Sequence, residues 1–137
     1  MLNLSTTQVW VRDQDEALTF WTDKVGFEIK EDVTLPEMNN FRWVSVGPKG
    51  QEGTSIVLME VPGQPVMDDA TKQQVEQLVA KGFATGQFFS TENARTTYDR
   101  LVAAGVEVVG EPTEQPYGID FGFRDPSGNQ YRVAQRP

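Results

Sequence analysis

The chain has 137 residues with no Cys and no His, and its 20 acidic residues outnumber the 12 basic ones, so the formal net charge is −8 at pH 7. This length suits one compact domain that buries its core without disulfides. The composition excludes thiol chemistry, removes the commonest general base and metal ligand, and argues against a nucleic-acid partner.

The first half of the chain predicts one helix and four strands. Alternation of polar and apolar residues predicts a strand over 7–11. Asp13 and Asp15 are typical helix caps, apolar residues at helical spacing continue to Val25, and Gly26 is typical of a helix end. Further strands are predicted over 27–33, 41–46 and 55–61.

The second half begins after a connector. Residues 62–65 read as a linker, and 67–81 predict a helix capped by Asp68 or Asp69, which either packs on a sheet rim or covers a ligand as a lid. A strand is then predicted from Phe83, followed by a helix over Asn93–Ala104 and strands over 106–109, 119–123 and 129–134.

The two halves resemble each other. TQVWVRDQDEALTFWTDKVGFEI corresponds to GQFFSTENARTTYDRLVAAGVEV, and the turn Gly47-Pro48-Lys49-Gly50 corresponds to Asp125-Pro126-Ser127-Gly128. Two such long copies predict an internally duplicated domain rather than a solenoid. The expected organisation is module one at about 4–61, a linker helix at about 62–82, and module two at about 83–135.

No stretch reaches the roughly 20 apolar residues that cross a bilayer, and the N-terminal MLNLSTTQVW lacks the regions of a signal peptide. We therefore expect a cytoplasmic protein with no membrane partner.

The pattern Asp13-x-x-x-Ala17-x-x-Phe20-Trp21-x-x-x-x-Gly26-Phe27-Glu28, with Arg124-Asp125-Pro126-Ser127-Gly128-Asn129 near the end, resembles the vicinal oxygen chelate superfamily. That group includes glyoxalase I, extradiol dioxygenases, fosfomycin-resistance proteins and bleomycin-resistance proteins. The resemblance implies an α+β fold in which two βαβββ modules form a half-open barrel. It also implies a homodimer.

In the metal-dependent members of that superfamily, four strand positions supply the ligands. The resemblance places them at Thr6, Val57, Gly86 and Arg132. None is a competent ligand, so we predict no metal and no cofactor, and the resemblance is closest to the metal-free branch of bleomycin-resistance type. The alternative is a metal-dependent lyase, isomerase or dioxygenase-like enzyme with relocated ligands, for which the candidates are Gln8, Gln87 and Glu60.

Strand alternation predicts a concave wall of aromatic rings, which suits an aromatic or cationic small molecule. The resemblance to the metal-free branch implies that the protein sequesters such a compound, and hence antibiotic resistance. The candidate ligand-binding residues are Gln8, Trp10, Phe41, Trp43, Met59, Phe88, Asp120 and Arg132.

Several readings of these residues stay open at this point. Trp10 and Phe88 are equally consistent with core packing, and Asp120 with Arg132 forms either an ion pair or a pair of ligand contacts. Asp120, Glu60 or Tyr117 would serve as a base if burial shifted its pKa. A third hypothesis is a dimerisation module whose cleft is plugged by its own side chains.

Overall fold

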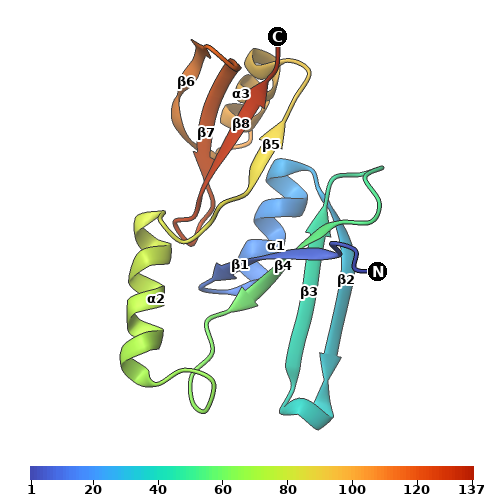
Figure 1. Cartoon of the computed structure of the whole chain (residues 1–137), viewed down its shortest axis with the longest axis vertical. Helices are drawn as coiled ribbons and strands as arrows, with labels where there is room; N and C mark the ends of the chain where they lie inside the picture. The colour runs from blue at the N-terminus through green and yellow to red at the C-terminus, as the bar shows by residue number, and fades with distance from the viewer. The chain divides into compact units, whose positions relative to one another are not determined.

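The computed structural model describes residues 1–137, which divide into two compact units, Met1–Glu76 and Gln77–Pro137. The first unit contains β1 (Thr6–Val11), α1 (Gln14–Thr19), the π-helical turn η1 (Phe20–Val25), β2 (Glu28–Leu35), the 3-10 turn η2 (Pro36–Met38), β3 (Phe41–Gly47) and β4 (Ser55–Glu60). Helix α2 (Asp69–Lys81) spans the boundary between the units. The second unit contains β5 (Phe88–Ser90), α3 (Ala94–Ala103), β6 (Glu107–Gln115), β7 (Gly118–Arg124) and β8 (Gln130–Gln135) (Figure 1).

Each unit has a four-stranded sheet of the same topology. The strand orders are β1-β4-β3-β2 and β5-β8-β7-β6. In both sheets the first strand pairs in parallel with the last, and the remaining neighbours are antiparallel. The α+β fold and the duplicated βαβββ modules are therefore confirmed. No helix is long and apolar enough to span a bilayer.

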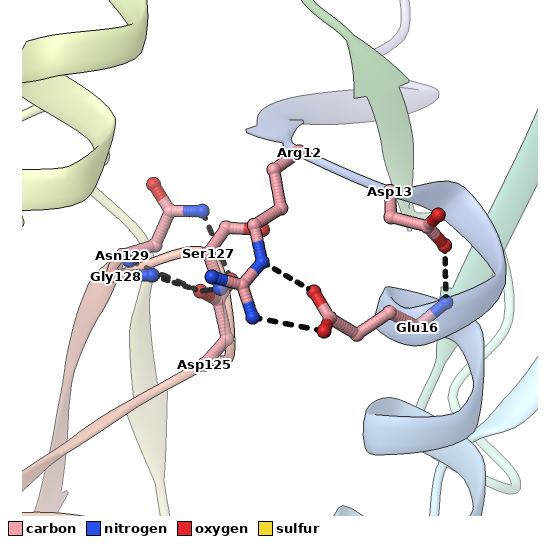
Figure 2. Close-up of polar contacts among 7 residues, drawn as sticks. All are labelled: Arg12, Asp13, Glu16, Asp125, Ser127, Gly128 and Asn129. Atoms are coloured by element: carbon pink, nitrogen blue, oxygen red, sulfur yellow. Dashed lines mark hydrogen bonds and ion pairs between the residues drawn. The ribbon is translucent and has the colours of Figure 1, made fainter.

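The helices α1 and α3 begin with equivalent caps. Asp13 Oδ1 accepts a hydrogen bond from Glu16 N at 2.7 Å, and Asn93 Oδ1 accepts one from Thr96 N at 2.9 Å. Both satisfy a backbone donor that the helix leaves free. Figure 2 shows the Asp13 cap together with the two-pronged contact from Arg12 to Glu16, at 2.7 and 2.9 Å. The predicted role of Asp13 is thus confirmed.

The core of each unit lies between its sheet and its helix. In the first unit, Trp21 is fully buried and stacks on Phe27 with ring centroids 5.1 Å apart. In the second unit, Tyr98 of α3 meets Phe121 of β7 edge to face at 5.5 Å. Such pairs add roughly 0.5–1.5 kcal/mol beyond area burial. Trp21 therefore belongs to the core of the first unit.

A buried carboxylate organises the turn between β7 and β8. Asp125 is 5% exposed, and its Oδ1 accepts backbone N–H groups from Ser127, Gly128 and Asn129, each at 3.0 Å (Figure 2). Its Oδ2 accepts Asn129 Nδ2 at 2.9 Å and the Tyr131 hydroxyl at 2.8 Å. Burial raises the pKa of Asp125, and these donors act against that rise.

The same turn requires glycine at one position. Gly128 has φ +107°, and a Cβ there would lie 2.6 Å from the carbonyl oxygen of Ala80 in α2. Since no side chain fits in that space, the turn packs directly against the backbone of the last turn of α2.

Both sheets have an acidic, irregular edge strand. The pairing of β2 with β3 shifts register between Ile29 and Glu31, and that of β6 with β7 shifts between Val109 and Thr113. These shifts mark β-bulges. The acidic residues on the two strands are Glu28, Glu31, Asp32, Glu107, Glu111 and Glu114.

Some predicted boundaries differ from the structure. The strand expected from Phe83 begins at Phe88, because residues 82–83 close α2 through hydrogen bonds from Gly82 N to Val79 O and from Phe83 N to Leu78 O. The strand expected to end at 109 continues to 115 beyond its bulge.

We expect Asp125→Ala to lower the free energy of unfolding by about 3 kcal/mol, since several buried donors would lose a charged acceptor. Urea unfolding followed by circular dichroism measures the change. Asp99→Asn, an exposed change on α3, is the control and should stay within about 0.5 kcal/mol of wild type. Equal stability of the Asp125 and Asp99 variants would contradict the organising role of the carboxylate.

Candidate functional site

The first sheet turns one face toward α1, and we call the opposite one its distal face. Arg42 lies on the α1 side, because its guanidinium binds Asp15 of α1 at 2.7 Å and Asp32 at 2.9 Å. Side chains alternate along a strand and match across paired positions. The register therefore places on the distal face Gln8, Trp10, Glu31, Val33, Phe41, Trp43, Ser45, Val57 and Met59.

The first sheet forks on this face. Strands β3 and β4 pair only at Ser45 with Val57 and at Val46 with Ile56, so Trp43 and Met59 lie on strands that have separated. The side chain of Gln14 bridges the fork, and its Nε2 donates to Arg42 O at 3.1 Å and to Leu58 O at 2.8 Å. The fork is thus held open with its carbonyl groups satisfied.

Aromatic and polar groups meet beside the fork. The indole Nε1 of Trp43 donates to Glu31 Oε1 at 3.2 Å, and both Trp10 and Trp43 are partly exposed. Ser45 is fully buried, and its Oγ makes no hydrogen bond. A ring with an adjacent carboxylate can hold a planar group by stacking or a cation by its charge.

The distal face of the second sheet, turned away from α3, carries a charged pair. Arg132 Nη2 lies 2.8 Å from Asp120 Oδ2, and the Asp120 side chain is 7% exposed against 42% for Arg132. Phe88 pairs with Arg132 across the parallel strands and is 79% exposed. Phe88 is therefore a surface ring rather than a core residue.

Gly122 makes room for this pair. It lies directly opposite Arg132, and a Cβ at this position would be 2.7 Å from Arg132 Nη1. The guanidinium therefore lies close to Gly122 and reaches diagonally to Asp120. A larger residue would push it away from the carboxylate.

Tyr117 completes the cluster from the turn between β6 and β7. Its hydroxyl donates to Asp120 Oδ2 at 2.7 Å, which raises the pKa of the phenol. Burial raises the pKa of Asp120, but the hydrogen bonds from Arg132 and Tyr117 and the charge of Arg132 outweigh burial, so the pKa falls below its usual value. A carboxylate of low pKa is a poor general base at neutral pH, and the cluster suits binding better than proton abstraction.

The positions that the resemblance assigns to metal ligands do not fit a metal ion. Val57 offers only methyl groups, Gly86 offers no side chain, and Arg132 is a cation engaged with Asp120. No group of three or more Asp or Glu side chains is arranged to hold a metal ion.

The alternative ligands Gln8 and Glu60 of the first unit do not fit a metal ion either. Gln8 pairs with Val57, whereas Glu60 lies three residues further along β4. Alternation puts Gln8 and Glu60 on opposite faces of the sheet, so they cannot share one ion.

The structure brings the sequence-predicted candidates together in two groups, one on each distal face. The first contains Gln8, Trp10, Phe41, Trp43 and Met59, and the second contains Phe88, Asp120 and Arg132. Sequence reasoning missed Gln14 and Glu31, and it considered Tyr117 only as a base. Alternation within the strand beginning at Glu28 would have revealed Glu31, whereas Gln14 gave no such signal.

Comparisons with known proteins place this geometry in context. The model of the Glyoxalase/Bleomycin resistance protein/Dioxygenase superfamily matches residues 3–133. The uncharacterized protein YurT of Bacillus subtilis (strain 168) is 32% identical over 136 residues, which cover 98% of this chain and 100% of YurT.

Two solved structures are also similar. UcmS2 is 39% identical with a TM-score of 0.90, and the match covers 98% of each chain. TnmS3, an antibiotic binding protein from Streptomyces sp. CB03234, is 29% identical with a TM-score of 0.76, and the match covers 100% of this chain and 98% of TnmS3.

We expect Arg132→Gln to lower the free energy of unfolding at pH 7 by about 1 kcal/mol, a value discounted because Arg132 is partly exposed to screening solvent. The pKa of Asp120 is lowered in the folded state, so the pair contributes fully above the unfolded pKa of about 3.9 and is lost as pH falls through the folded value. Urea unfolding at pH 7 and pH 3 should show the difference between the variant and wild type shrinking at the lower pH. Arg136→Gln, an exposed change, should show no difference at either pH.

Proposed function

Because the chain belongs to the Glyoxalase/Bleomycin resistance protein/Dioxygenase superfamily, we propose that it is a metal-free small-molecule binding protein that sequesters an aromatic or cationic compound. The observation that carries the proposal is the set of partly exposed rings on the distal face of the first sheet, where Trp10, Phe41 and Trp43 stand beside a fork. Flat rings on strands held apart by Gln14 suit a planar ligand.

The charges favour a ligand that is neutral or cationic. Glu31 lies against Trp43, and the chain carries a net charge of −8. An acidic protein raises the local concentration of cations, and an indole face with a carboxylate at its edge binds a positive group.

Resemblance in sequence and structure adds independent support. TnmS3 is an antibiotic binding protein, and nearly the whole of both chains takes part in the match. We propose the same class of role here, in a cytoplasmic homodimer that protects by sequestration. The residues proposed to contact the ligand are Gln8, Trp10, Phe41, Trp43, Met59, Phe88, Asp120 and Arg132.

A thermal-shift screen against planar aromatic and cationic compounds, with and without divalent metals, tests this proposal. A ligand that binds only the folded state stabilises it by about 2.7 kcal/mol at a hundredfold excess over its Kd. Stabilisation by compounds without metal is the expected result. Stabilisation by a metal alone would overturn the metal-free assignment.

We expect Trp43→Ala to weaken the binding of a compound found by that screen about tenfold, since one stacked ring contributes roughly 0.5–1.5 kcal/mol beyond the burial that is also lost. Isothermal titration calorimetry measures the Kd. Phe83→Ala, which removes a ring that is 77% exposed and follows α2, is the matched control and should leave the Kd unchanged. An unchanged Kd for the Trp43 variant would remove the first distal face from the site.

A further inference from the structure

We propose that Asp120 and Arg132 recognise an aromatic hydroxyl group of the ligand, and that the phenol of Tyr117 occupies this position in the free protein. The inference rests on the proposed function and names a chemical group that the ligand must carry.

Tyr117 already places an aromatic hydroxyl on Asp120. Its hydroxyl lies 2.7 Å from Asp120 Oδ2, and Arg132 Nη2 lies 2.8 Å from the same oxygen. The cluster therefore already accommodates one aromatic hydroxyl at hydrogen-bonding distance. A ligand phenol would meet the same acceptor with the same geometry.

The other carboxylate oxygen of Asp120 has no partner. Asp120 is 5% exposed, and its Oδ1 is buried without a hydrogen bond. Arg132 holds this carboxylate in its ionised form, and a buried ionised oxygen is stabilised by any donor that reaches it. The carboxylate therefore depends on the donors at Oδ2, and a ligand hydroxyl that replaced Tyr117 there would keep it stabilised.

Tyr117 is placed so that it can be displaced. It stands in the two-residue turn between β6 and β7 and is 57% exposed. Since much of the side chain is already in solvent, moving it away costs mainly one hydrogen bond, which a ligand hydroxyl replaces.

The charge at this cluster selects a neutral donor. Arg132 lies on the same carboxylate, so a protonated amine at this position would face a guanidinium at close range. Gly122 keeps the guanidinium in place by leaving the space above its backbone free. A hydroxyl donates to Asp120 without adding charge, so the cluster favours a phenol over an amine.

The test uses the full chain with 2-naphthol and its methyl ether, 2-methoxynaphthalene, as probes. Both have the same ring system, but only 2-naphthol has a donor. Fluorescence titration measures the Kd of each probe for wild type, Tyr117→Phe, Asp120→Asn and the control Tyr98→Phe, whose ring packs against Phe121 on the α3 side.

We expect wild type to bind 2-naphthol more tightly than the ether. Removing the competing hydroxyl in Tyr117→Phe should strengthen 2-naphthol binding roughly fivefold to tenfold, the equivalent of one hydrogen bond, and leave the ether unchanged. Asp120→Asn replaces the charged acceptor with a weaker neutral one and should reduce the preference for 2-naphthol, and Tyr98→Phe should behave as wild type.

Equal affinity of wild type for the two probes, or a Tyr117→Phe variant that binds 2-naphthol no better than wild type, would overturn the inference. Tyr117→Phe retains the Asp120–Arg132 pair, so this result is decisive even if Asp120→Asn does not fold. Failure of both probes to bind any variant also overturns the inference. The proposed function is tested separately, by the thermal-shift screen and by the Kd of Trp43→Ala for a compound that the screen finds.

Discussion

The second unit depends on the carboxylate of Asp125. Its hydrogen bonds to Ser127, Gly128 and Asn129 set the turn between β7 and β8, and the bond from Tyr131 ties the first residues of β8 to the same anchor. A turn fixes the register of the hairpin that follows it. A slip of one residue would carry every β8 side chain to the other face of the sheet. The carboxylate of Asp125 therefore determines that Arg132 lies on the distal face beside Asp120.

The two copies of the module share a topology but differ in the contacts that stabilise their hairpins. At the position that corresponds to Asp125, the first unit has Gly47, which has no side-chain acceptor. The hairpin of β7 and β8 pairs continuously, whereas β3 and β4 pair at two positions and then separate around Gln14. The same backbone plan therefore supports a continuously paired, charged hairpin in one unit and a forked, aromatic sheet in the other.

Much of the fold and of the candidate site could be predicted from the sequence, because strand alternation is a local property. Trp10 and Trp43 fall on one face of the first sheet as their spacing indicates, and the caps and glycine turns mark α1 and α3. Contacts between distant segments could not be predicted in this way. In the sequence, Gln14 is an ordinary residue of the first turn of a helix, and nothing indicates that it binds Arg42 and Leu58. Gly110 and Pro112 are typical of the end of a strand, although β6 pairs with β7 again from Thr113.

The acidic, bulged strands at the edges of the two sheets have a consequence for self-association. An exposed edge offers unpaired backbone groups to which another chain can add a strand, and such addition has no natural end. Like charges on β2 and on β6 repel an identical edge, the bulges break the regular spacing of donors and acceptors, and Pro112 removes one donor from β6. These two edges therefore resist growth into fibres at high protein concentration.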